Sequence, residues 1–160
     1  MDKFGFVFAV LGMALAAFLP GWGSARGVGI AGEAAAAAVS EEPSLFSKVL
    51  LLQLLPGTQG IYGLLIGFLS MSSIGILSGS AEISLAKGLA LFGTCVPIAV
   101  VGYFSAVSQA KVSVSSINLV AKRPDQFGKA MLFPAMVETY AILALLVSLL
   151  ALNGVNALNI

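Results

Sequence analysis

Long apolar stretches, separated by short polar links, run through most of this chain. Four of them are clear, at residues 4–25, 49–77, 88–107 and 130–152. Each reaches the roughly 20 residues that a membrane-spanning helix needs. None alternates apolar and polar residues with a period of two, so helices are favoured over the strands of a membrane barrel. The pattern predicts an all-α integral membrane protein with four transmembrane helices.

An internal repeat organises these helices. When the chain is shifted against itself by 81 residues, matching residues align in both halves. The aligned pairs are Gly12 and Gly93, Gly21 and Gly102, Ser24 and Ser105, Pro43 and Pro124, Phe46 and Phe127, Lys48 and Lys129, and Thr58 and Thr139. Both copies run in the same direction across the membrane, so they predict two tandem helical hairpins, residues 1–81 and 82–160. Because the first apolar stretch carries part of the repeat, we expect it to be a helix and not a signal peptide.

Small residues mark the first and third helices. The first carries five glycines between residues 21 and 32, and the third carries serines and alanines between residues 105 and 116. Small residues at such spacing let helix backbones approach closely. Two interpretations remain open: packing inside a four-helix monomer, or an inner circle of first and third helices from many subunits with the bulkier second and fourth helices outside.

Composition and charge narrow the class of protein and the kinds of chemistry it can carry out. Hydrophobic residues make up 59% of the 160 residues and charged residues only 9%, which is typical of an integral membrane protein. The net charge of +1 gives no argument for nucleic acid. Histidine is absent and Cys95 is the sole cysteine, which excludes imidazole chemistry, and disulfides or thiolate metal clusters within one chain. Basic residues cluster at the two hairpin links, so we expect cytoplasmic links and external termini. These basic residues are Lys48, Lys122, Arg123 and Lys129.

Glu138 is the most informative residue. It is a carboxylate without a nearby charge in the otherwise apolar run 130–152. An ionised side chain at the bilayer centre costs at least about 2.5 kcal/mol, so such residues face a partner, a cavity or an ion. Glu138 therefore predicts ion or proton translocation. Its repeat partner is Gly57, so one carboxylate serves two hairpins.

Further polar groups are expected at the depth of Glu138. Thr58 and Gln59 follow Pro56, which lacks an N–H group and leaves a backbone oxygen available. Gln59 lies 16 residues after Pro43, Gln109 15 before Pro124 and Glu138 14 after Pro124. At about 1.5 Å per residue, these offsets give similar depths of about 21 to 24 Å.

Such a set of oxygen atoms suits a small hard cation, and one carboxylate neutralises one Na⁺. The alternative is that the hydroxyl and the amides only join neighbouring helices. Tyr62 shares the helix face of Thr58, and its hydroxyl either holds Glu138 or is satisfied elsewhere while the ring faces lipid. Arg26, Glu33 and Lys111 are further charged residues of the first and third helices, and two locations stay open for them: a ring lumen beside lipid headgroups, or partly cytoplasmic helix surface.

At these residues the chain resembles the K/c-type proteolipid subunit of bacterial V-type ATPases, especially the sodium-transporting kind. The resemblance covers the whole chain and is most specific at residues 54–60 (LLPGTQG), at Gln109 with Lys111, and at residues 136–142 (MVETYAI). It implies a duplicated four-helix subunit that assembles into a rotor ring and binds one Na⁺. It also implies the ligands, which are the Leu55 carbonyl and the side chains of Thr58, Gln59, Gln109 and Glu138, with Tyr62 bonded to the glutamate.

The resemblance further implies the partners and the mode of action. The ring of identical subunits would lie in membrane lipids, turn against a stator membrane subunit, and receive torque from a cytoplasmic central-stalk subunit. The chain has no phosphate-binding loop, so we expect no catalytic role of its own. The alternatives are the same ring carrying H⁺, a small four-helix exporter of cationic compounds, and a purely structural proteolipid.

Overall fold

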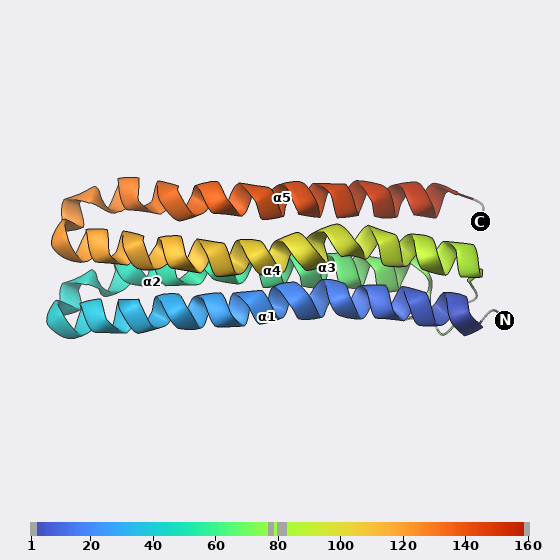
Figure 1. Ribbon diagram of the computed structural model, residues 1–160, viewed down its shortest axis with the longest axis horizontal. Coiled ribbons are helices and arrows are strands. Elements are labelled where there is room, and N and C mark those ends of the chain that lie inside the picture. The colour runs from blue at the N-terminus through green and yellow to red at the C-terminus, as the bar shows by residue number, and fades with distance from the viewer. Residues whose placement is uncertain (1–2, 77–78, 80–82, 159–160) are drawn as a thin grey trace.

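The computed structural model describes residues 3–76, 79 and 83–158, which form an elongated helical bundle. Its elements are α1 (Lys3–Glu41), η1 (Pro43–Leu45), α2 (Phe46–Leu54), η2 (Leu55–Gly57), α3 (Thr58–Ser73), α4 (Leu85–Lys122), η4 (Pro124–Gln126) and α5 (Phe127–Ala157). The hairpin links lie at one end of the bundle, and the two termini lie at the other (Figure 1). The boundary predicted between residues 81 and 82 lies outside the described residues.

Four helical segments within the described residues are long and apolar enough to cross a membrane. They are Phe4–Glu41, Pro43–Ser73, Leu85–Lys122 and Pro124–Ala157. The second segment joins α2, η2 and α3 into one span. A helix of 38 residues is about 57 Å long, well beyond the roughly 30 Å hydrocarbon core, so the ends of α1 and α4 extend past it. The predicted all-α fold with four transmembrane helices is confirmed.

The first helices of the two hairpins, α1 and α4, form the main helix pair of the bundle. They lie side by side and make the most extensive contact between any two described elements, while α3 packs mainly on α1 and α5 mainly on α4 (Figure 1). Glycine permits this approach: a Cβ atom on Gly23 would lie 2.8 Å from the carbonyl oxygen of Tyr103. Small residues in α1 therefore set the spacing of this pair.

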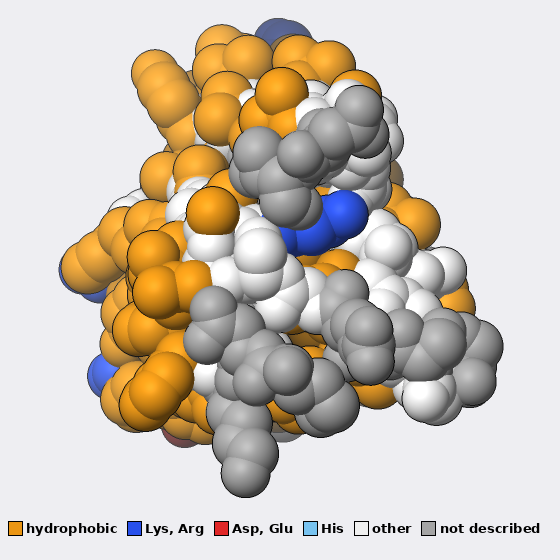
Figure 2. All heavy atoms as spheres, turned by 90° about the vertical axis from the view of Figure 1, so that its right-hand side faces the viewer, with side chains coloured by type: hydrophobic (Ala, Val, Ile, Leu, Met, Phe, Trp, Pro, Cys, Tyr) orange, Lys and Arg blue, Asp and Glu red, His pale blue; other side chains and the backbone are white. Residues whose placement is uncertain are grey.

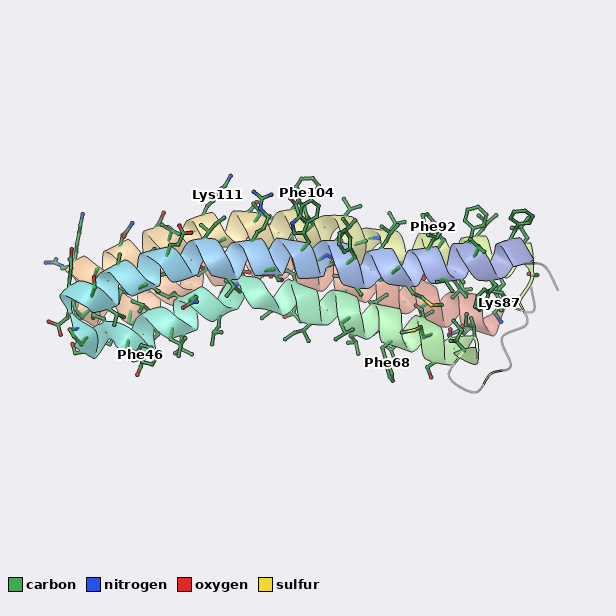
Figure 3. The ribbon with its side chains drawn as sticks, turned by 90° about the horizontal axis from the view of Figure 1, so that it is seen from below. Phe46, Phe68, Lys87, Phe92, Phe104 and Lys111 are labelled. Carbon is green, nitrogen blue, oxygen red and sulfur yellow. The ribbon has the colours of Figure 1, made fainter. Side chains whose placement is uncertain are left out.

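Large hydrophobic side chains cover the flanks of the bundle. Leu64, Leu132 and Leu150 are each at least 60% exposed. Figure 2 looks along the bundle at the end that carries the termini and shows hydrophobic side chains gathered around its flanks. Contiguous exposed apolar surface of this extent fits lipid or a further protein surface. Phe46 and Phe68 point outward on the α2 and α3 side, and Phe104 and Lys111 on the opposite side (Figure 3).

The two hairpin links are joined at their end of the bundle. The Lys48 Nζ atom donates a hydrogen bond of 3.0 Å to the carbonyl oxygen of Pro124. The Glu42 carboxylate accepts a hydrogen bond of 3.2 Å from the Ser44 backbone N–H and so caps η1. Hydrogen bonds from the Ser44 hydroxyl and backbone N–H lower the pKa of Glu42 from its ordinary value. Glu42 thus remains an anion on the exposed surface of the first link.

Candidate ion-binding site

A break in the second span presents the first pair of oxygen atoms. The proline ring of Pro56 removes an N–H group from the helical ladder, and Leu55–Gly57 form a 3₁₀ turn between α2 and α3. The Leu55 carbonyl oxygen accepts the Thr58 backbone N–H and, at 3.1 Å, the Thr58 hydroxyl. The break therefore holds two of the predicted ligand atoms next to each other.

Two buried amides connect α3 to α5 through α4. The Gln59 Nε2 atom donates to Gln109 Oε1 at 2.6 Å. The Gln109 Nε2 atom in turn donates to Glu138 Oε2 at 3.4 Å and to the Pro134 carbonyl at 3.0 Å. Gln59 and Gln109 are both 0% exposed. The residues that the sequence places at one depth therefore lie in one hydrogen-bonded chain.

Glu138 receives a second donor from the first hairpin. The Tyr62 hydroxyl donates to Glu138 Oε1 at 2.6 Å. Both carboxylate oxygens thus accept a hydrogen bond from a neutral group, Tyr62 on one side and Gln109 on the other. An ionised carboxylate only accepts hydrogen bonds, so this arrangement fits the charged form of Glu138. The Tyr62 hydroxyl is thus directed at Glu138 and does not face lipid in this structure.

One acceptor atom in this hydrogen-bonded network of Gln59, Gln109 and Glu138 is unsatisfied. Among the described residues, Gln59 Oε1 is buried and has no hydrogen-bond partner. Leaving a buried polar atom unpaired costs about 1–3 kcal/mol, so such an atom in a native structure requires an explanation. A carbonyl-type oxygen can be satisfied only by a hydrogen-bond donor or by a cation. The orphan oxygen therefore remains open to a hydrogen-bond donor or to a cation.

Ser105 belongs to this network, although its sequence pattern predicted only a small packing residue. Its hydroxyl lies 3.4 Å from Gln59 Nε2 and donates to the Val137 carbonyl at 3.2 Å. Ser105 precedes Gln109 by four residues and so shares its helix face. This four-residue spacing is the sequence feature that could have indicated a role for Ser105 beside Gln109. Ser105 fixes the Gln59 amide from the α4 side and ties α4 to α5 beside Glu138.

The described residues contain no group of three or more His, Cys, Asp or Glu side chains able to hold a metal. The candidate site therefore combines one carboxylate with neutral oxygens and differs from a multi-carboxylate site for divalent ions. Hydrogen bonds connect Gln59, Gln109, Glu138 and Tyr62 into one network. Leu55 and Thr58 are hydrogen-bonded to each other. Arg26 lies away from both and donates to the Tyr103 hydroxyl at 3.2 Å.

Comparison with known proteins gives the family. The family model for the C subunit of ATP synthase matches residues 11–70 and again residues 92–151. The chain belongs to this ATP synthase proteolipid family. The second match lies 81 residues after the first, which is the offset of the sequence repeat. Members of the family form rings within membrane ATPase complexes, so this chain is part of a larger multi-pass membrane assembly.

Two relatives refine this placement within the family. The chain is 49% identical over 151 residues to the V-type sodium ATPase subunit K of Enterococcus hirae, with 94% of each chain covered. It is 36% identical over 149 residues to the A-type ATP synthase subunit K of Methanocaldococcus jannaschii, which covers 93% of this chain and 63% of that relative. The resemblance to a rotor-ring proteolipid is confirmed, and the exporter and structural alternatives are not favoured.

Proposed function

We propose that this chain is the rotor-ring subunit of a V-type ATPase and carries one Na⁺ per subunit across the membrane. The proposed ligands are the Leu55 carbonyl and the side chains of Thr58, Gln59, Gln109 and Glu138, with Tyr62 orienting the carboxylate. The name of the Enterococcus hirae relative supports the choice of sodium. The transported ion is a cargo of the site and not a resident cofactor.

The observation that carries this proposal is the unsatisfied Gln59 Oε1 atom, which belongs to the hydrogen-bonded chain that ends at Glu138. A proton on Glu138 would need only the carboxyl group and one acceptor. Na⁺ prefers several oxygen ligands, and its single charge is neutralised by one carboxylate. A neutral occupied site can enter lipid, whereas the empty carboxylate carries the full cost of an unpaired charge in the bilayer.

Rotation then couples to transport through the charge state of Glu138. A stator membrane subunit provides water access, and Na⁺ entering from the cytoplasm neutralises the carboxylate. The loaded site turns through membrane lipid until a stator cation competes for Glu138 and releases Na⁺ on the other side. This chain performs no ATP hydrolysis, and torque reaches it at the hairpin links from a central-stalk subunit. The basic residues at those links favour a cytoplasmic location for them.

The test is carbodiimide labelling of Glu138 in membranes. Carbodiimide modifies the protonated carboxyl, so Na⁺ bound at the site should slow labelling at fixed pH. We expect about a tenfold decrease once sodium reaches roughly ten times its dissociation constant. Choline chloride at the same ionic strength is the control, and Glu138→Gln should abolish the labelling. If labelling of Glu138 is indifferent to sodium, the ring carries H⁺ and the sodium proposal is wrong.

A further inference from the structure

The two buried amides of the candidate site, Gln59 and Gln109, can each point in either of two directions. An amide side chain carries an acceptor oxygen and a donor NH₂ group, and a half-turn exchanges them while leaving its shape almost unchanged. The direction of Gln59 decides which of the two groups stays without a partner in the network. Because only the oxygen can bind a cation, whatever fixes this direction belongs to the ion chemistry of the site.

Acceptors on α5 fix the direction of Gln109. The Pro134 carbonyl can only accept, and it takes a hydrogen bond of 3.0 Å from Gln109 Nε2. The same nitrogen lies 3.4 Å from Glu138 Oε2, which is a second acceptor. A reversed amide would place its oxygen against both acceptors. Gln109 Oε1 therefore faces Gln59, where it accepts from Gln59 Nε2 at 2.6 Å.

Ser105 fixes the direction of Gln59 by the same logic. A hydroxyl has one proton, and Ser105 donates it at 3.2 Å to the Val137 carbonyl, which can only accept. The Ser105 oxygen is then left as an acceptor for Gln59 Nε2, at 3.4 Å. A reversed Gln59 amide would bring its oxygen against Ser105 Oγ and Gln109 Oε1 together. Both neighbours thus require a donor from Gln59, and its oxygen is the atom that stays unpaired.

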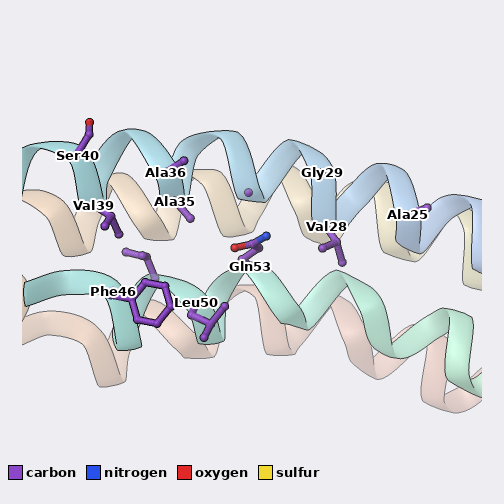
Figure 4. Close-up of a pocket in the computed structure, with 12 residues that line it drawn as sticks. Ala25, Val28, Gly29, Ala35, Ala36, Val39, Ser40, Phe46, Leu50 and Gln53 are labelled. Atoms are coloured by element: carbon purple, nitrogen blue, oxygen red, sulfur yellow. The ribbon is translucent and has the colours of Figure 1, made fainter. Parts of the chain in front are cut away.

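Burial strengthens these restraints. Gln59 and Gln109 are 0% exposed and Ser105 is 6% exposed, so a partner lost here is not readily replaced by water. Gln53 gives a contrast on the same membrane span. It is half-buried and lies between α1 and α2 at a groove of about 800 Å³, which leaves its amide room to turn (Figure 4). The fixed direction of Gln59 is therefore a property of its own neighbours.

We propose that Ser105 is a positioning residue that sets the ion preference of the site, because its hydroxyl keeps Gln59 Oε1 available to a cation. Among the described residues, the hydrogen bonds of Ser105 go to Gln59 and Val137 and not to the Glu138 carboxylate. A reversed Gln59 would present N–H groups, which repel a cation but still allow a proton on Glu138. Ser105 thereby favours Na⁺ over H⁺. The inference rests on the proposed function, since it concerns the ligands of that ion.

Ser105→Ala tests this role in membranes that contain the assembled protein. We expect the sodium concentration that half-protects Glu138 from carbodiimide to rise roughly fivefold, because one hydrogen bond that orients Gln59 is lost. The pH at which labelling is half-maximal without sodium should remain that of the parent chain, since Ser105 does not bond to Glu138. A loss of sodium protection without a change in this pH profile is the expected signature.

Ser148→Ala is the matched control for loss of a buried hydroxyl between α4 and α5. Ser148 is 0% exposed, and its hydroxyl accepts the Ile98 backbone N–H at 3.2 Å. It lies ten residues beyond Glu138, about 15 Å along α5. We expect parent-like sodium protection in this variant. Equal losses in Ser148→Ala and Ser105→Ala would show that Ser105 only joins the two helices, and would overturn the proposal.

Two further substitutions at Ser105 extend the test. Ser105→Thr keeps the hydroxyl, so its sodium protection should stay closer to the parent chain than that of Ser105→Ala. Ser105→Cys keeps the size of the side chain, but sulfur is a weak hydrogen-bond acceptor, so sodium protection should weaken. Native mass spectrometry checks that each ring assembles, and Ser105→Cys carries the test if Ser105→Ala does not. Parent-like protection in Ser105→Cys would then reject the role of Ser105.

The outcomes separate this inference from the proposed function. If sodium does not protect Glu138 in the parent chain, the sodium proposal is wrong and this inference falls with it. If sodium protects the parent chain and Ser105→Ala equally well, the sodium proposal stands and only the role of Ser105 is wrong.

Discussion

At the residue scale, Glu138 combines charge with an unusual set of neutral partners. Tyr62 and Gln109 each donate to one carboxylate oxygen, at 2.6 Å and 3.4 Å. Neither partner carries a positive charge, so the two hydrogen bonds stabilise the carboxylate but leave its negative charge without a counter-ion. The unsatisfied Gln59 Oε1 adds a further negative dipole end at the same network. Both features favour a cation.

Tyr62→Phe tests the orienting hydrogen bond. Hydrogen bonds to charged groups contribute about 1.5–3 kcal/mol, and about 1.4 kcal/mol corresponds to a factor of ten in affinity. We expect the sodium concentration that half-protects Glu138 from carbodiimide to rise roughly tenfold or more. Tyr103→Phe is the control, because the Tyr103 hydroxyl accepts from Arg26 outside the site. Equal sodium protection in Tyr62→Phe and the parent chain would contradict this role.

At the element scale, the break between α2 and α3 decides where the backbone oxygen points. In an uninterrupted α-helix the Leu55 carbonyl would accept the Gln59 N–H. In the 3₁₀ turn Leu55–Gly57 it accepts the Thr58 N–H, and the Thr58 hydroxyl lies 3.1 Å from it. Pro56 also packs against α1, because a Cβ atom on Gly27 would lie 2.8 Å from Pro56 Cβ. The break is therefore fixed by sequence and by packing.

Pro56→Ala should restore a regular helix through this turn. The returned N–H group would favour α-helical hydrogen bonding and would move the Leu55 carbonyl out of its present orientation. We expect the half-protecting sodium concentration to rise roughly fivefold, which corresponds to about 1 kcal/mol for one lost contact. The mass of the assembled ring should stay unchanged. Unaltered sodium protection would show that the 3₁₀ turn does not contribute to the site.

At the scale of the whole molecule, the tandem repeat makes the two ends of the bundle different. Both hairpin links lie at one end, where Lys48 bonds to the Pro124 carbonyl, and both termini lie at the other end (Figure 1). A stalk subunit that touches every copy in a ring would therefore meet the same two links each time. α1 and α4 lie next to each other, with α3 packed mainly on α1 and α5 mainly on α4, which suits the pair to the inner circle of such a ring.

The sidedness of the links can be measured directly. Ser44 in the first link and Asn156 near the other end are both exposed. In a Cys95→Ser background, we expect a membrane-impermeant maleimide added to intact cells to label Asn156→Cys, and to label Ser44→Cys only after permeabilisation. We expect this orientation because basic residues cluster at the links, and basic loops stay on the cytoplasmic side of the membrane. Labelling of Ser44→Cys in intact cells would reverse the proposed orientation.

Much of the fold and of the candidate site was predictable because it depends on local properties. Apolar length gives the four spans, and the regular rise of a helix places Gln59, Gln109 and Glu138 at one depth. The sequence did not predict the hydroxyl of Ser105 as a link between Gln59 and the Val137 carbonyl. Helical rise gives depth but not which side chains meet, since that depends on how each helix is rotated by its neighbours.

The sequence by itself determined that this chain is a duplicated four-helix membrane protein with one deep carboxylate. Composition, the length of the apolar stretches and the internal repeat can all be read directly from the order of the residues. Only the tertiary structure decided which donor meets which oxygen of Glu138 and which amide oxygen stays unpaired. It also decided that equivalent residues of the two hairpins differ, with Ile117 covered and Ala36 exposed. The reason is that packing partners come from helices far apart in sequence, and the first hairpin covers only one face of the second.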